Sequence, residues 1–175
     1  MLPTPDAVAP HETIALIGPP AAGKSRVGKR LAKLLSVPYV DTDAMVVSQH
    51  GPIPEIFATH GEPYFRELER AAVAVALQSP GVVSLGGGAV LDPETQADLA
   101  EARVVLLTVR AEAIAKRIAN GKRPLVTDLD SWKRLVASRS DLYHSLADYT
   151  ADTSSRPIDT IVEEIARWAQ EEGHA

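Results

Sequence analysis

The sequence predicts an α/β protein, a three-layer sandwich in which helices cover both faces of a five-stranded parallel sheet. Short apolar runs of strand type alternate with longer helical runs along the chain, a pattern typical of such sheets. Glycine-rich or acidic segments follow three of the apolar runs directly, where a parallel sheet places its active site. The 175 residues and a hydrophobic content of 45% fit a single domain with a substantial core.

The elements are predicted from these runs and from their start signals. Asp92 before Pro93 indicates a helix start, because aspartate caps free N–H groups and proline suits the first helical position. Residues 13–175 are expected to form the domain, after a flexible lead at residues 1–12. Strands are predicted at residues 13–17, 38–41, 81–85, 103–109 and, more weakly, 149–152. Helices are predicted at residues 25–35, 44–50, 53–60, 63–78, 93–100, 111–119, 131–146 and 157–171.

The first predicted strand leads into GPPAAGKS at residues 18–25, which has the P-loop spacing G-x-x-x-x-G-K-[ST]. A strand, a glycine-rich turn and a helix start direct successive backbone N–H groups into one concavity that binds phosphates. Lys24 then reaches the β- and γ-phosphates, and the Ser25 hydroxyl ligates Mg²⁺. The sequence therefore predicts a nucleoside triphosphate site; a tight turn with an exposed lysine is the alternative.

Two aspartates, Asp41 and Asp43, end the second predicted strand. The third strand lacks the acid that many P-loop proteins use to hold Mg²⁺, so Asp41 is predicted to help bind the ion, directly or through water. Asp43 is left to face a second substrate, where it accepts a hydroxyl proton or orients the hydroxyl for attack on the γ-phosphoryl group. The alternative for Asp43 is a helix cap.

Arg66 and Glu69 share one face of a predicted helix, because they lie three residues apart. An arginine held by Glu69 offers bidentate binding to a carboxylate or phosphate. The spacing alone favours the ordinary interpretation, an exposed ion pair that contributes about 0.2–0.5 kcal/mol.

Gly86, Gly87 and Gly88 follow a predicted strand of buried type. Consecutive glycines weaken regular structure, so they indicate that a ligand or another backbone segment approaches closely. Their N–H groups are candidates to donate to a polar substrate, and a flexible turn is the alternative.

Four arginines in the second half lie at or near predicted loops or helix ends: Arg117, Arg123, Arg139 and Arg156. Some of them should contact the nucleotide, although each alone is more typical of a solvated surface. Residues 120–130, which contain Arg123, are predicted to form a mobile lid; a solvated connector is the alternative.

Composition excludes several function classes. A net charge of −5 and a pI near 5.5 argue against a general nucleic-acid binder. No cysteine is present, which excludes disulfides and thiolate metal sites, and the five histidines show no metal-ligand spacing. The sequence shows neither a secretory signal nor a run of membrane-spanning length. We expect a cytoplasmic monomer without nucleic-acid or membrane partners.

Taken together, the motifs resemble the shikimate kinase family from about residue 13 to residue 168. The matching segments are GPPAAGKS, DTD, IFATHGEPYFRELE, SLGGGAV, RPL at residues 123–125 and SRSDLY. The resemblance implies a fold like that of the nucleoside monophosphate kinases, with substrate-binding helices at about residues 43–79 and a lid at 120–130. It also implies transfer of the ATP γ-phosphoryl group to the 3-hydroxyl of shikimate, with Mg²⁺, in aromatic amino acid biosynthesis.

The resemblance also implies roles for individual residues. Arg123 would close over the phosphates and stabilise charge during transfer. Asp43 would hold the ring hydroxyls and act as the base, while Arg66 and Arg139 pair with the substrate carboxylate and Gly87 donates a backbone N–H. The nucleotide would be held by Ala21, Ala22, Gly23, Lys24, Ser25, Arg26, Arg117, Arg123 and Arg156.

Two residues depart from the family pattern. Arg26 replaces a serine or threonine, so the α-phosphate loses a hydroxyl donor, and Asp141 replaces a proline, close enough in sequence to pair with Arg139. A kinase of another small hydroxy acid, such as gluconate, is the main alternative, but it explains Arg66, Arg139 and the three glycines less well. A non-catalytic nucleotide switch is a weaker one, since the guanine-specific N-K-x-D element is missing.

Overall fold

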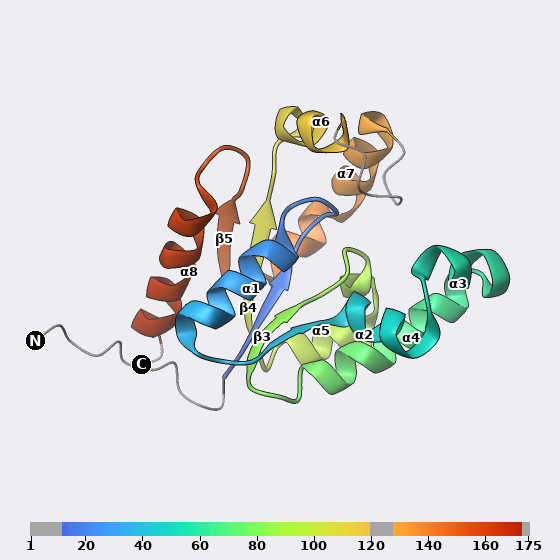
Figure 1. The fold of residues 1–175 in the computed structure, drawn as a ribbon, viewed down its shortest axis with the longest axis horizontal. Helices are drawn as coiled ribbons and strands as arrows, with labels where there is room; N and C mark the ends of the chain where they lie inside the picture. Colours follow the sequence, from blue (N-terminus) through green and yellow to red (C-terminus); the bar gives the residue numbers. More distant parts are fainter. Residues whose placement is uncertain (1–11, 120–127, 173–175) are drawn as a thin grey trace, which may run out of the picture.

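The computed structural model describes residues 12–119 and 128–172, and it confirms the predicted parallel sheet (Figure 1). Within these residues the strands pair in the order β2-β3-β1-β4-β5, all parallel. The predicted strand limits agree with the structure to within one residue. The strands are β1 (Thr13–Ile17), β2 (Tyr39–Asp41), β3 (Gly81–Ser84), β4 (Arg103–Thr108) and β5 (Tyr149–Asp152).

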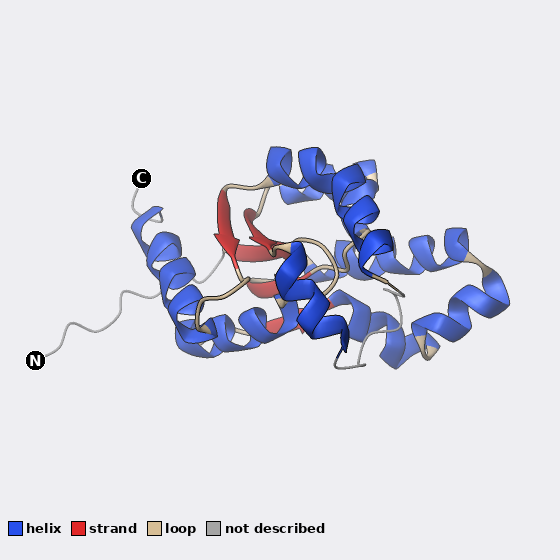
Figure 2. Cartoon of the chain, turned by 90° about the horizontal axis from the view of Figure 1, so that it is seen from above, coloured by secondary structure: helices blue, strands red, loops and turns tan. Residues whose placement is uncertain are grey.

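Helices surround the strands, as the view from above shows (Figure 2). Helices α2, α3 and α4 extend to one side of the sheet, and α6 and α7 lie together above it in Figure 1. The helices are α1 (Lys24–Leu35), α2 (Thr42–His50), α3 (Ile53–His60), α4 (Glu62–Ala76), α5 (Pro93–Leu99), α6 (Ala111–Ala119), α7 (Leu129–Leu146) and α8 (Ile158–Glu172). A short 3₁₀ helix, η1 (Ala89–Leu91), was not predicted.

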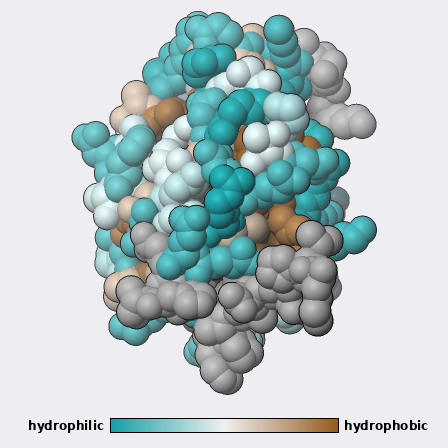
Figure 3. All heavy atoms as spheres, turned by 90° about the vertical axis from the view of Figure 1, so that its left-hand side faces the viewer, coloured by the Kyte–Doolittle hydropathy of each residue, from teal (hydrophilic) through white to brown (hydrophobic). Residues whose placement is uncertain are grey.

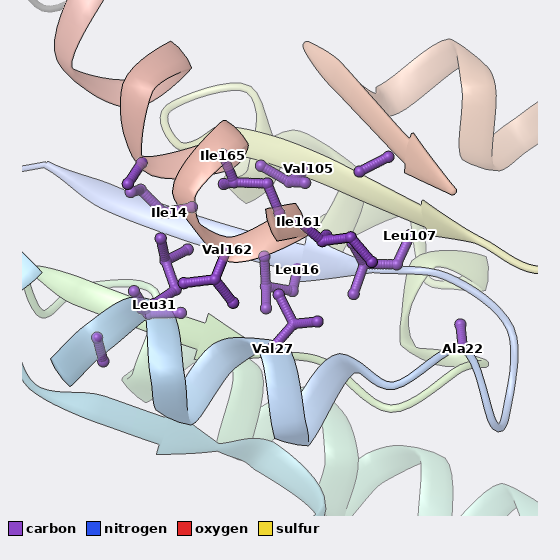
Figure 4. Close-up of a cluster of buried hydrophobic side chains, with 14 of the residues drawn as sticks. Ile14, Leu16, Ala22, Val27, Leu31, Val105, Leu107, Ile161, Val162 and Ile165 are labelled. Carbon is purple, nitrogen blue, oxygen red and sulfur yellow. The ribbon is translucent and has the colours of Figure 1, made fainter. Parts of the chain in front are cut away.

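Alternation along β1 divides the core into two layers. Ile14 and Leu16 face α1 and α8, whereas Ala15 and Ile17 face the side covered by α4, α5 and α7. Successive strand side chains point to opposite faces of a sheet, and β1 is apolar on both because helices cover both. Figure 4 shows side chains of α1 and α8 meeting those of β1 and β4. The core thus fixes the carboxyl end of β1, where the P-loop segment begins.

The end of the predicted lid requires a correction. Leu129 and Asp130 form the first turn of α7 rather than a loop, because the Asp128 carboxylate caps the helix by accepting from the backbone N–H of Ser131 at 2.6 Å. Residues 120–127, which include Arg123, lie outside the described residues, as do residues 1–11 of the predicted lead.

The surface that carries α8 is largely hydrophilic, with hydrophobic atoms in small, separate areas (Figure 3). Within residues 12–119 and 128–172, none of the helices combines the length and the apolar character that crossing a lipid bilayer requires.

We expect Leu16→Ala to lower the free energy of unfolding by about 2–5 kcal/mol, because it leaves a cavity beside the central strand. Leu34→Ala is the matched control, since Leu34 is 50% exposed on α1 whereas Leu16 is fully buried, and it should change the value by less than about 0.5 kcal/mol. Urea unfolding followed by circular dichroism measures both. Equal losses in the two variants would contradict the assignment of Leu16 to the core.

Candidate active site

The turn between β1 and α1 has positive φ angles at three residues, two of which are glycines. Gly18, Ala21 and Gly23 have φ angles of 145°, 67° and 91°, in the region that residues other than glycine rarely adopt. The Lys24 ammonium donates to the carbonyls of Gly18 at 2.7 Å and Pro19 at 2.9 Å. The lysine therefore lies across the turn, at the start of α1, where the helix dipole favours an anion.

A cavity of about 300 Å³ adjoins this turn. Arg117 on α6 crosses its wall, donating to the carbonyls of Ala21 and Thr153 at 2.6 Å each. Arg156 also lines the cavity and pairs with Glu164 at 2.7 Å. The structure thus brings together Arg26, Arg117 and Arg156, three arginines that the sequence assigned to the nucleotide. The cavity is lined by Ala21, Ala22, Gly23, Arg26, Val27, Arg117, Thr153, Arg156, Ile158 and Ile161.

Ser25 and Asp41, the predicted Mg²⁺ pair, are in contact. The Ser25 hydroxyl donates to Asp41 Oδ2 at 2.8 Å, while Asp41 Oδ1 caps α2 by accepting from the Ala44 N–H at 3.1 Å. The helix cap considered for Asp43 is therefore made by Asp41. No cluster of three or more acidic or histidine side chains suited to a metal occurs in the described ranges. A hydroxyl and one carboxylate nevertheless fit Mg²⁺, which keeps several waters and binds substrate phosphates.

A second cavity, of about 220 Å³, adjoins the P-loop turn at Pro20. Asp43 on α2, Arg66 on α4, the glycine turn (residues 86–88) and Arg139 on α7 all line it. These residues come from four separate segments, and the sequence assigned each of them to one substrate. The remaining wall is formed by Pro20, Ile53, Phe57, Glu62, Phe65, Glu69 and Leu135. The sequence indicated Glu69 as the partner of Arg66 and residues 43–79 as substrate-binding helices, but it did not indicate Pro20 or Leu135 as part of this wall.

Arg66 and Glu69 form an ion pair in which the acid is buried and the arginine is partly exposed, so the ordinary interpretation of an exposed pair is wrong. Their side chains meet at 2.8 Å, and Glu69 is only 4% exposed. Glu62 holds the same guanidinium from the other side at 3.1 Å. Burial raises the pKa of Glu69, and hydrogen bonding and charge from Arg66 oppose that rise. The two carboxylates fix the direction in which the guanidinium faces the cavity.

The glycine turn packs against charged groups. A Cβ at Gly86 would lie 2.7 Å from Asp43 Oδ1 and 2.8 Å from Glu69 Oε2, and one at Gly88 would overlap the Arg66 guanidinium. A side chain at position 86 or 88 would collide with these charged groups, so both positions require glycine. Among the residues that the structure describes, the N–H groups of Gly87 and Gly88 donate no hydrogen bond. These two donors suit a polar ligand.

Asp43 occupies the first turn of α2 and lines the second cavity. Burial raises the pKa of Asp43, and the neighbouring charge of Asp41 raises it further. Lys24 and Arg66 oppose these effects. An aspartate with a raised pKa is a stronger base than an ordinary one once it is deprotonated.

Known proteins resemble this chain in sequence and in fold. A family model described as shikimate kinase matches residues 20–170. A shikimate kinase from Thermobifida fusca is 45% identical over 157 residues, covering 87% of this chain and 91% of the relative. One from Mycobacterium avium is 44% identical over 153 residues, covering 84% and 87%. The chain belongs to the shikimate kinase family.

A solved structure of a shikimate kinase from Acinetobacter baumannii in complex with shikimate has a TM-score of 0.85 to this chain. It is 28% identical and covers 92% of this chain and 94% of its own. A gluconokinase from Sinorhizobium meliloti has a TM-score of 0.55 at 18% identity, which shows a shared fold alone. The alternative hydroxy-acid kinase is thus supported only at the level of the fold.

Asp141 departs from the shikimate kinase pattern, but the ion pair that it was expected to make with Arg139 is not formed among the residues that the structure describes. Asp141 is exposed, and within residues 12–119 and 128–172 no ion pair joins it to Arg139. The physical reason is the helix, because residues two apart point in different directions. Arg139 therefore keeps its place in the wall of the cavity.

Charge substitutions near Asp43 should move its pKa in opposite directions. We expect Asp41→Asn to lower the pKa of Asp43, since a repelling charge is removed, and Lys24→Met to raise it, since an attracting charge is removed. Nuclear magnetic resonance of ¹³C-labelled aspartate carboxylates over a pH titration measures both shifts. Shifts of the same sign in the two variants would contradict this electrostatic description.

Proposed function

We propose that the chain is a shikimate kinase that transfers the γ-phosphoryl group of ATP to the 3-hydroxyl of shikimate. Two cavities lined by adjacent residues of one P-loop turn carry the proposal. Pro20 lines one cavity and the next three residues line the other. A phosphate donor and a small acceptor are thus presented to each other across the same turn.

The second cavity matches the chemistry of shikimate, a carboxylate with three ring hydroxyls. Arg66 and Arg139 supply cations for the carboxylate. Asp43 supplies an acceptor for the hydroxyls, and Gly87 and Gly88 supply backbone donors. Phe57 and Phe65 supply an apolar surface for the carbon ring.

In the proposed reaction Asp43 accepts the proton of the 3-hydroxyl as that oxygen attacks the γ-phosphorus. The bond from the γ-phosphorus to the bridging oxygen breaks, and ADP leaves with that oxygen. Lys24 and the backbone N–H groups at the start of α1 stabilise charge on the phosphates. Because Asp43 must be charged to accept a proton, its raised pKa moves the acid limb of activity to higher pH.

The proposal includes Mg²⁺, held by Ser25 and Asp41. When bound, the ion neutralises charge on the phosphates. Arg123, outside the described residues, is assigned by its motif to closing over the phosphates. Arg26, Arg117 and Arg156 are assigned to the nucleotide because they line its cavity. We further propose a cytoplasmic monomer that serves aromatic amino acid biosynthesis, by analogy with the family.

ADP release with ATP and Mg²⁺ should depend on shikimate and exceed release with quinate, gluconate or nucleoside monophosphates by at least tenfold. Lys24→Ala should abolish this turnover, because its ammonium stabilises the transferred phosphoryl group. Lys29→Ala on the exposed side of α1 is the matched control and should retain it. A larger rate with gluconate, or unchanged turnover in Lys24→Ala, would overturn the assignment.

Arg66→Ala should raise KM for shikimate by about 10- to 100-fold, the loss expected for a hydrogen bond between charged groups. KM for ATP should change less than twofold, because Arg66 lies outside the nucleotide cavity. Arg70→Ala on the same helix is the control, since Arg70 pairs with Asp98 and Glu94 and does not line the shikimate cavity. Steady-state kinetics with each substrate varied separates these effects; equal changes in both KM values would refute the role of Arg66.

A further inference from the structure

Two hydroxyls from neighbouring helices hold the glycine turn. Thr42 on α2 accepts from the Gly86 N–H at 3.3 Å. Tyr143 on α7 donates from its hydroxyl to the Gly87 carbonyl at 2.5 Å. Tyr143 is 2% exposed, whereas Gly87 is of intermediate exposure, so the bond is shielded from water on the tyrosine side. The turn is thus fixed at its start by one hydroxyl and near its end by the other.

The Tyr143 bond sets the direction of a backbone donor. The Gly87 carbonyl and the Gly88 N–H belong to one planar trans peptide, so they point in opposite directions. Peptides between glycines rotate easily because no Cβ restricts them. With its carbonyl held by Tyr143, this peptide keeps the Gly88 N–H in one orientation. Among the described residues that N–H has no partner within the protein.

Tyr143 also lies one helical turn after Arg139, on the same face of α7. Burial raises the pKa of Tyr143, while the positive charges of Arg139 and Arg66 oppose the rise. The hydroxyl therefore stays protonated and remains a donor at neutral pH. Its bond joins the helix that carries Arg139 to the turn that packs against Arg66.

We propose that Tyr143 is a positioning residue for the acceptor substrate. Its hydroxyl fixes the peptide between Gly87 and Gly88, and with it the Gly88 N–H and the placement of Arg139 relative to the turn. This inference rests on the proposed shikimate kinase function. It predicts that the hydroxyl contributes to binding of shikimate before any phosphoryl transfer and contributes little to the nucleotide site.

Tyr143→Phe removes the hydroxyl and keeps the ring. We expect KM and the dissociation constant for shikimate, the latter from calorimetry without ATP, to rise about five- to tenfold. We expect kcat and KM for ATP to stay within twofold of the wild type. Tyr149→Phe is the matched control for the shikimate values, because Tyr149 stacks on Trp168 at 5.1 Å and does not line the second cavity; it should leave KM and the dissociation constant for shikimate unchanged.

A lower thermal midpoint with unchanged shikimate affinity would overturn the proposal, because the hydroxyl would then act on stability alone. An equal loss in the values for both substrates would also overturn it. If Tyr143→Phe does not fold, p-aminophenylalanine at position 143 tests the idea, since its amino group restores a donor: wild-type shikimate affinity supports the role, and weakened affinity in a folded variant opposes it. Failure of the wild type to phosphorylate shikimate would instead refute the proposed function.

Discussion

The structure depends on how the carbonyl oxygens of the P-loop turn are held, because a turn that binds an anion must direct its N–H groups toward it and its carbonyls away. One donor from the turn itself and three from distant segments bind these carbonyls. Lys24 binds those of Gly18 and Pro19, and side chains from three distant segments bind the next three carbonyls. Those bonds are Trp132 Nε1 to Pro20 at 2.9 Å, Arg117 to Ala21 at 2.6 Å and Thr153 Oγ1 to Ala22 at 2.7 Å. Because a trans peptide points its C=O and N–H in opposite directions, holding the carbonyls of Pro20 and Ala22 also fixes the directions of the Ala21 and Gly23 N–H groups. These two N–H groups are candidate donors to a phosphate.

One of these donors, Trp132, lies on a helix that connects the two cavities. Trp132 belongs to α7, whose later turns carry Arg139 and Tyr143. Helix α7 therefore holds the P-loop near its first turn and the glycine turn near its last. A displacement of this helix would change both cavities together. Helix α7 thus helps to set the placement of the two cavities relative to each other.

The sequence predicted what depends on local pattern. The sheet, the strand limits and the P-loop follow from apolar runs and glycine spacing, and the order of the motifs indicated the family. The contacts of Tyr143 and Trp132 could not be predicted, because each joins residues at least 56 positions apart in the chain. The burial of Glu69 was also missed, because a three-residue spacing is the same on an exposed face and on one covered by a glycine turn.

Burial of two acids beside the second cavity makes the stability of the fold depend on pH. Glu69 and Asp43 both approach Gly86, and burial raises the pKa of each. A carboxyl whose pKa is raised on folding stabilises the protein at low pH, and this contribution is lost as pH rises through the raised pKa. At neutral pH the charged carboxylates of Asp43 and Glu69 therefore lower the stability of the fold. The positive charges of Arg66 and Lys24 partly offset this loss. A buried ion pair is a weak source of net stability, so the pair of Arg66 and Glu69 is better explained by orientation. The pair holds a partly buried guanidinium in the wall of the second cavity, where the proposed function places the substrate carboxylate.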